Sequence, residues 1–136
     1  MNLTSRYMGL TLKHPLMVGA SPLVDELGMG KRLEDAGASA IVMHSLFEEQ
    51  IERERHAPLQ HLEAFEESYA EARSYLPTPP DFALGPDQYL ERIRGIKDTV
   101  EIPVIGSLNG TTASGWLEYA RLIEQAGADA LELNVY

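Results

Sequence analysis

The chain has 136 residues, of which 44% are hydrophobic, and its 21 acidic and 11 basic side chains give a net charge of −10. A surface this negative repels the phosphates of nucleic acids and of anionic lipids, so neither a nucleic-acid nor a membrane partner is expected. The sequence has no cysteine, no signal-peptide pattern at its start and no apolar run near the ~18 residues of a membrane helix. These properties favour a cytoplasmic protein with an ordinary apolar core and no thiolate metal site.

The first part of the sequence predicts a hairpin and then a β/α unit. Residues 3–7 and 10–12 are two short strand candidates around Gly9, and we expect this hairpin to close the bottom of the structure. Residues 16–19 form a short apolar run after a proline, and an amphipathic pattern over 26–36 predicts the first helix.

A second apolar run, over 40–43, is followed by an insert that interrupts this pattern. The insert covers 46–85, begins with charged and polar residues and contains an amphipathic stretch at 62–76 that prolines terminate. We expect a helix at 62–76, whose acidic side chains form either a solvated face or a lid over the strand ends.

After the insert the alternation of helices and strands resumes. A helix is expected to begin at Pro86, and an apolar strand follows at 102–106. Thr111 or Thr112 can cap a further helix, and a last apolar strand covers 130–133.

Two segments of the chain repeat the same pattern, LEDAGASAIVM at 33–43 and IEQAGADALEL at 123–133. In each copy a helix ends at a glycine, Gly37 or Gly127, which can take the left-handed conformation at little steric cost. A short apolar strand follows each glycine, so the repeated unit is a helix end, a stop and a strand.

Alternating strands and helices are typical of an α/β fold with a parallel sheet, and near-continuous apolar runs suit strands that are covered on both faces. A complete (β/α)8 barrel takes about 250 residues. We therefore predict an α/β fold that corresponds to the N-terminal half of a TIM (β/α)8 barrel. It would contain about four β/α units, a short N-terminal β-hairpin and a helical insert after the second strand.

Ligands of parallel β/α proteins bind beyond the carboxyl ends of the strands, so the residues that follow each strand are the candidate site. Small or hydrogen-bonding residues follow every strand candidate, although Ser21 and Asn109 each also fit an ordinary turn. His44 and Asn134 take equivalent places in the repeat, so both should point from the same rim. The candidate site residues are Ala20, Ser21, His44, Ser45, Asn109 and Asn134.

Other chemistries are not indicated by the sequence. His56 and His61 lack the i, i+4 spacing of a helical zinc site, so no metal site is predicted. There is no Walker motif, no G-x-G-x-x-G pattern after a strand and no hydrolase elbow. No acid–base pair stands out among the carboxylates, so the catalytic residues are not assigned.

Several segments resemble the dihydroorotate dehydrogenase family in their order and spacing. They are YMGLTLKHPL at 7–16, ASP at 20–22, GASAIVMHS at 37–45, IPVI at 102–105 and AGADALELN at 126–134. The resemblance covers essentially the whole chain apart from 46–85. It is strongest to the divergent, dihydroorotate dehydrogenase-like branch of the family.

The resemblance implies a (β/α)8 barrel that binds FMN at the carboxyl ends of its strands and oxidises dihydroorotate to orotate in pyrimidine biosynthesis. In that family a base removes a proton from one carbon while hydride passes to the flavin. By resemblance, Ala20, Ser21 and Ser45 would contact FMN. Asn134 would hydrogen-bond the flavin or the substrate, and Asn109 would lie nearby. The resemblance also implies a small-molecule substrate and a homodimer for the full-length protein.

Three features depart from the family's pattern. His44 stands where the family has a lysine that contacts both flavin and substrate. The insert replaces the Asn-x-Met-Gly loop that holds orotate, and Tyr136 departs from the segment that carries the catalytic cysteine or serine. These differences weaken orotate as the substrate, and we expect the catalytic residue beyond Tyr136.

Because only about half of the barrel strands are indicated, we expect these residues to form an inactive fragment that binds FMN poorly. One alternative is a fragment of a phosphate-binding β/α-barrel isomerase or synthase, since the phrase AGADA also occurs in such barrels. Another is a non-enzymatic half-barrel that self-associates through the unpaired edges of its sheet.

Overall fold

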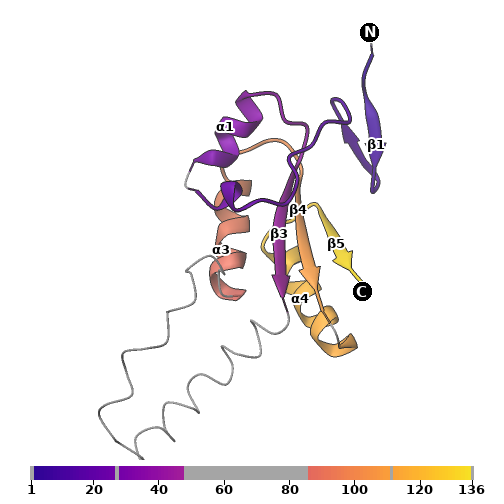
Figure 1. The fold of residues 1–136 in the computed structure, drawn as a ribbon, viewed down its shortest axis with the longest axis vertical. Coiled ribbons are helices and arrows are strands. Elements are labelled where there is room, and N and C mark those ends of the chain that lie inside the picture. The colour runs from indigo at the N-terminus through magenta and orange to yellow at the C-terminus, as the bar shows by residue number, and fades with distance from the viewer. Residues whose placement is uncertain (1, 27, 48–85, 111, 136) are drawn as a thin grey trace, which may run out of the picture.

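A parallel sheet of three strands, in the order β3-β4-β5, forms the centre of the fold (Figure 1). The computed structural model describes residues 2–26, 28–47, 86–110 and 112–135, so the helix expected at 62–76 lies outside the described residues. The elements are β1 (Ser5–Tyr7), β2 (Leu10–Leu12), η1 (Pro22–Asp25), α1 (Met29–Asp35), β3 (Ile41–Phe47), α3 (Pro86–Lys97), β4 (Val104–Asn109), α4 (Ala113–Gln125) and β5 (Ala130–Asn134).

The predicted α/β alternation and the N-terminal hairpin are confirmed. Strands β1 and β2 pair antiparallel, whereas β3 pairs parallel with β4, and β4 with β5. The carboxyl ends of these three parallel strands therefore meet at one edge of the sheet (Figure 1). Within the described residues the sheet is open and does not close into a barrel.

The first predicted strand, at 16–19, is reduced to a single parallel bridge between Val18 and Ile41. The N–H of Val18 donates to the C=O of Ala40 at 3.0 Å, and its C=O accepts from the N–H of Val42 at 2.9 Å. The segment thus lies beside β3, as expected for a first barrel strand. The described sheet has three strands rather than four because this segment contributes only that bridge.

The prediction of one helix over 26–36 is wrong in its first part. The structure has instead the 3-10 turn η1, which the hydroxyl of Ser21 caps by accepting from the N–H of Leu23 at 3.2 Å. Helix α1 begins only at Met29, after Gly28 with a φ of 76°. That left-handed conformation cannot continue a right-handed helix, so the glycine separates η1 from α1.

Helices α3 and α4 begin where the sequence predicts. Helix α3 starts at Pro86, and the hydroxyl of Thr112 caps α4 by accepting from the N–H of Gly115 at 3.2 Å. Helix α4 packs closely on β4 at Gly106, where an added Cβ would stand 2.5 Å from Cγ2 of Ile123. The absence of a side chain at Gly106 therefore sets how near the helix lies to the sheet.

The two copies of the sequence repeat adopt the same local structure, and the glycines that end α1 and α4 both have positive φ, as predicted. Two residues after each glycine, a backbone N–H donates to the strand segment that precedes the helix. The N–H of Ser39 donates to the C=O of Leu16 at 3.1 Å, and that of Asp129 donates to the C=O of Val104 at 2.8 Å. The Asp129 carboxylate also accepts from the N–H of Val104 at 2.7 Å and fixes the register of β5.

Hydrophobic residues cover both faces of the sheet. Helices α3 and α4 cover one face, where Met43, Val104 and Leu108 belong to the main core. The opposite face is covered near the amino ends of the strands by the hairpin, whose Leu12 packs with Ile105 and neighbouring apolar residues. We call this second face, which carries Ile105 and faces away from α3 and α4, the inward face. The position of the hairpin fits its expected place at the bottom of the structure.

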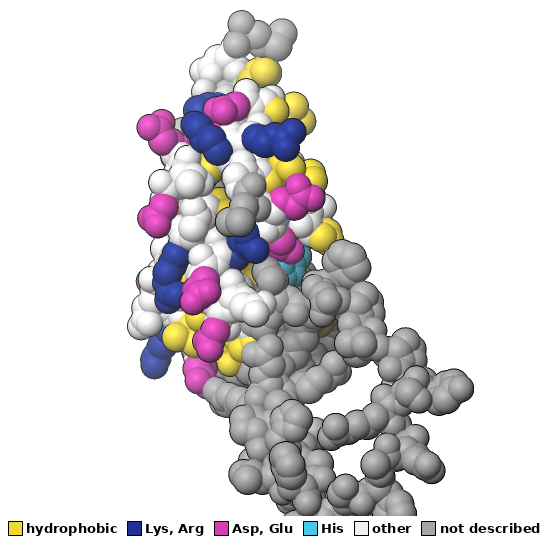
Figure 2. Space-filling view, turned by 90° about the vertical axis from the view of Figure 1, so that its left-hand side faces the viewer, with side chains coloured by type: hydrophobic (Ala, Val, Ile, Leu, Met, Phe, Trp, Pro, Cys, Tyr) yellow, Lys and Arg dark blue, Asp and Glu magenta, His cyan; other side chains and the backbone are white. Residues whose placement is uncertain are grey.

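The side of the molecule that carries α1 and α3 presents charges of both signs (Figure 2). On α1, the ammonium of Lys31 lies 2.8 Å from Glu34 and 3.3 Å from Asp35. Interspersed charges of this kind are typical of a solvent-exposed helix face. Among the helices that the structure describes, none has the length and apolar content needed to cross a membrane.

Candidate ligand site at the strand ends

Polar side chains gather on the inward face at the carboxyl edge of the sheet. Because side chains alternate along a strand, Ser107 lies on the same face as Ile105, and Glu132 lies on the same face as Ala130. The inward face is therefore apolar beneath the hairpin and polar near the carboxyl ends of the strands. We call Ser45, Ser107, Glu132 and Asn134 the strand-end cluster.

Hydrogen bonds join the four side chains of the strand-end cluster. The hydroxyl oxygens of Ser45 and Ser107 lie 2.8 Å apart. The amide Nδ2 of Asn134 donates to both hydroxyls, at 2.8 Å to Ser45 and 3.2 Å to Ser107. The Ser107 hydroxyl donates to Oε1 of Glu132 at 3.2 Å. Three strands thus contribute to one network, in which two predicted site residues, Ser45 and Asn134, are in direct contact.

A register shift in β3 determines which of its side chains reach the inward face. Val42 pairs with Ile105, but the next pair along the two strands is Ser45 with Ser107. Strand β3 therefore has one residue more than β4 over this interval, as in a β-bulge. The extra residue brings Ser45 beside Ser107, where their side chains can bond.

The side chain of Tyr89 completes the hydrogen bonding at this shift. Its hydroxyl accepts from the N–H of Ser107 at 2.9 Å and donates to the C=O of the same residue at 3.1 Å. Burial raises the pKa of the Tyr89 phenol; the hydrogen bond with Ser107 opposes this shift, and the charges of Asp25 and Glu132 add to it. The hydroxyl therefore keeps the proton that it donates to the backbone.

His44 makes its contacts outside the strand-end cluster. Its Nδ1 lies 3.1 Å from Oδ1 of Asp25 in η1, and both side chains are largely buried. Its ring packs edge-on against Tyr89, with 5.2 Å between the ring centroids. The equivalence of His44 and Asn134 in the repeat therefore does not extend to their contacts, because β3 carries an extra residue at this point and β5 does not.

Of the remaining predicted residues, Asn109 is the one that the structure places at the same edge of the sheet. Asn109 ends β4 and is in register with Asn134 of β5. Ser21 caps η1, and the exposed Ala20 precedes it. The structure thus brings Ser45 and Asn134 into contact and places Asn109 next to them. The hydroxyl of Ser21 instead forms a local cap of η1.

Ser107, Glu132 and Tyr89 were not among the predicted site residues. The sequence contains a signal that could have identified Glu132, because a carboxylate inside an apolar strand needs polar partners. Ser107 was expected just after a strand, but β4 continues to Asn109 and holds it inside the sheet. Tyr89 sits on the apolar stripe of α3, and nothing in the sequence distinguished its hydroxyl.

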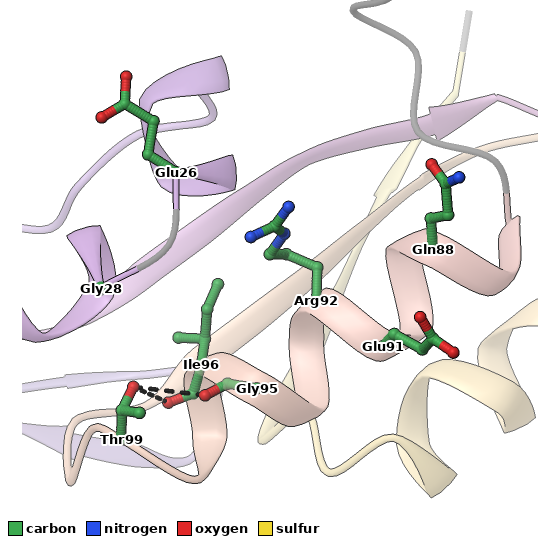
Figure 3. Close-up of a pocket in the computed structure, with 9 residues that line it drawn as sticks. Glu26, Gly28, Gln88, Glu91, Arg92, Gly95, Ile96 and Thr99 are labelled. Carbon is green, nitrogen blue, oxygen red and sulfur yellow. Dashed lines mark hydrogen bonds between the residues drawn. The ribbon is translucent and has the colours of Figure 1, made fainter.

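A separate cleft of about 390 Å³ lies between the η1–α1 region and α3 (Figure 3). The guanidinium of Arg92 extends into it, whereas the carboxylates of Glu26 and Glu91 point away from that group. The hydroxyl of Thr99 turns back to α3 and donates to the C=O of Ile96 at 2.9 Å. The cleft shares no residue with the strand-end cluster and is lined by none of the predicted site residues.

The strand-end cluster consists of hydroxyls, an amide and a carboxylate that three parallel strands hold at one edge. In the part of the chain that the structure describes, no group of three or more His, Asp or Glu side chains is placed to hold a metal ion. No protein-family model and no curated protein matches the chain.

Proposed function

We propose that the chain supplies the first β/α units of an FMN-dependent oxidoreductase of the dihydroorotate dehydrogenase type, which acts on a CH–CH bond of a small cyclic substrate. The observation that carries the proposal is the 2.8 Å contact between Ser45 and Asn134, which come from the two outer strands of the sheet. Ligands of parallel β/α proteins bind at this edge. Both residues belong to segments that resemble the flavin-binding positions of the family.

The chemistry of the strand-end cluster fits the polar edge of a flavin ring, which carries an N–H group between two carbonyls. The carbonyl oxygen of the Asn134 amide can accept from such an N–H group, since its Nδ2 is already bonded to Ser45 and Ser107. The chemistry that bound FMN supplies is acceptance of a hydride. The residues of this chain would bind and orient the ring and the substrate, and the apolar half of the inward face would exclude water.

An NMR titration of the 136-residue chain with FMN tests this proposal. We expect weak, saturable shifts of the backbone amides of Ser45 and Ser107 and of the Asn134 side-chain amide. The near-isosteric variant Asn134→Leu should abolish these shifts because it removes the polar atoms that contact the ring. The matched control, Gln125→Leu on the exposed end of α4, should leave them unchanged.

Two results would overturn the proposal. The first is an FMN titration that shifts only residues lining the cleft between α1 and α3. The second is a set of shifts at Ser45 and Ser107 that Asn134→Leu leaves unaltered while its spectrum remains that of a folded chain.

A further inference from the structure

Glu132 fixes the direction of the hydrogen bonds that the two serine hydroxyls donate in the strand-end cluster. An ionised carboxylate can only accept, so the single hydroxyl hydrogen of Ser107 is committed to Oε1 of Glu132. The Ser107 oxygen must then accept in its contact with Ser45, which means that the Ser45 hydroxyl is the donor in that 2.8 Å pair. The chain of bonds therefore runs from Ser45 through Ser107 to Glu132.

Asn134 completes this directed network. One amide hydrogen of its Nδ2 goes to Ser45 and the other goes to Ser107. Both hydroxyl hydrogens and both amide hydrogens are therefore consumed inside the cluster. The groups left over are acceptors, namely Oδ1 of Asn134, the second carboxylate oxygen of Glu132 and a lone pair on Ser45.

The three described strands that carry the cluster add no positive charge to offset Glu132. None of the strands β3, β4 and β5 carries a lysine or an arginine. His44, the one basic side chain on these strands, lies against Asp25 rather than against the cluster. An anion placed here would be repelled by the Glu132 carboxylate and would meet spare acceptors, because every hydroxyl and amide hydrogen of the cluster is already used.

We infer that the strand-end cluster recognises a neutral group that donates N–H or O–H, and that it rejects a carboxylate. The inference rests on the proposed function and narrows it, because dihydroorotate carries a carboxylate on its ring. The substrate class that fits is the uncharged cyclic imide or amide, in which a ring N–H meets the second carboxylate oxygen of Glu132 while Oδ1 of Asn134 faces the flavin. Glu132 acts as a positioning residue, since it sets the donor direction of its neighbours.

Uracil and orotate are suitable probes, because they share the same ring N–H groups and differ by one carboxylate. Each is titrated into the 136-residue chain at about 0.15 M salt, which screens the long-range effect of the net charge. The readouts are the Ser107 backbone amide and the Asn134 side-chain amide in NMR spectra. We expect uracil to bind about tenfold more tightly than orotate, a ratio that corresponds to about 1.4 kcal/mol.

The variant Glu132→Gln tests the cause of this preference. The glutamine amide is uncharged and adds donors, so the ratio of uracil to orotate affinity should fall to about threefold or less. The matched control Glu124→Gln makes the same charge change at an exposed position on α4 and should leave the ratio unchanged. Because the wild-type pair of titrations needs no variant, the inference stays testable if Glu132→Gln does not fold.

The inference is overturned if orotate binds the wild-type chain as tightly as uracil, if uracil moves neither readout, or if folded Glu132→Gln keeps the wild-type ratio. Each of these results is distinct from failure of the proposed function, which the FMN titration reports. If the chain binds FMN at the cluster but does not distinguish uracil from orotate, the flavin proposal stands and only the proposed substrate class is overturned.

Discussion

The phenolic hydroxyl of Tyr89 serves both backbone groups of Ser107, accepting from its N–H at 2.9 Å and donating to its C=O at 3.1 Å. These two groups are directed toward β3, at the point where the register between β3 and β4 shifts. A side chain from α3 thus completes the hydrogen bonding of the sheet. It also links the helix layer to the residue at the centre of the strand-end cluster.

Replacement of Tyr89 by phenylalanine should destabilise the protein by about 2–4 kcal/mol, because a buried N–H and a buried C=O both lose their partner. Urea denaturation of Tyr89→Phe against the wild-type chain measures this difference. Tyr7→Phe removes the same hydroxyl from a 43% exposed side chain in β1, and its effect should stay within about 0.5 kcal/mol. A Tyr89→Phe variant as stable as Tyr7→Phe would contradict this role.

Stability should fall at alkaline pH because the pKa of Tyr89 is raised in the folded chain above its ordinary value of 10.0, mainly by burial. Above that ordinary value the unfolded chain loses the phenolic proton while the folded chain retains it, so unfolding becomes more favourable as pH rises. Denaturation midpoints between about pH 9 and pH 11 should fall more steeply for the wild-type chain than for Tyr89→Phe. Equal slopes for the two proteins would show that Tyr89 does not contribute.

An alanine at Gly106 should destabilise the fold by about 1–3 kcal/mol through overpacking, since its Cβ would stand 2.5 Å from Cγ2 of Ile123. The matched control is Gly95→Ala in α3, where no atom lies within 4 Å of an added Cβ. That variant should stabilise the helix by about 0.5–1 kcal/mol. Thermal denaturation of both variants checks the prediction, and a neutral Gly106→Ala would mean that α4 can move outward at little cost.

The outer side of β5 should promote self-association, because within the described residues no strand pairs with it and apolar side chains lie exposed beside it. Leu133 is 46% exposed and Val135 is 72% exposed. We expect the weight-average mass in sedimentation equilibrium to rise with protein concentration and Leu133→Lys to reduce this rise. Leu3→Lys, at an exposed position outside the sheet, is the control. A mass independent of concentration would contradict the prediction.

Much of the fold follows from local patterns in the sequence. The cap at Thr112, the helix start at Pro86 and the glycines that end the two repeat helices are short-range signals, and the structure confirms them. The boundary at Gly28 was missed because an amphipathic pattern continues through it. The strand expected at 16–19 is a bridge, since strand length depends on pairing with neighbours and not only on apolar content.

The candidate site was predicted only in part, because some of its contacts also depend on how the strands pair. Ser45 and Asn134 meet because parallel strands bring their carboxyl ends to one edge, a rule that needs only the order of the elements. The contacts of His44 could not be predicted, because they depend on one extra residue in β3 that appears only when the register with β4 is known. The role of Tyr89 has the same origin, since its hydroxyl bonds to backbone groups at that shift.

The extra residue in β3 means that strand register, as well as residue type, sets the chemistry of the inward face. If β3 paired with β4 in even register beyond Val42, His44 rather than Ser45 would lie opposite Ser107, and its imidazole would turn inward. An acceptor-rich lining would then gain an imidazole without any substitution. Loss or gain of a bulge at this point of the strand is thus a route by which a scaffold of this kind could exchange one class of ligand for another.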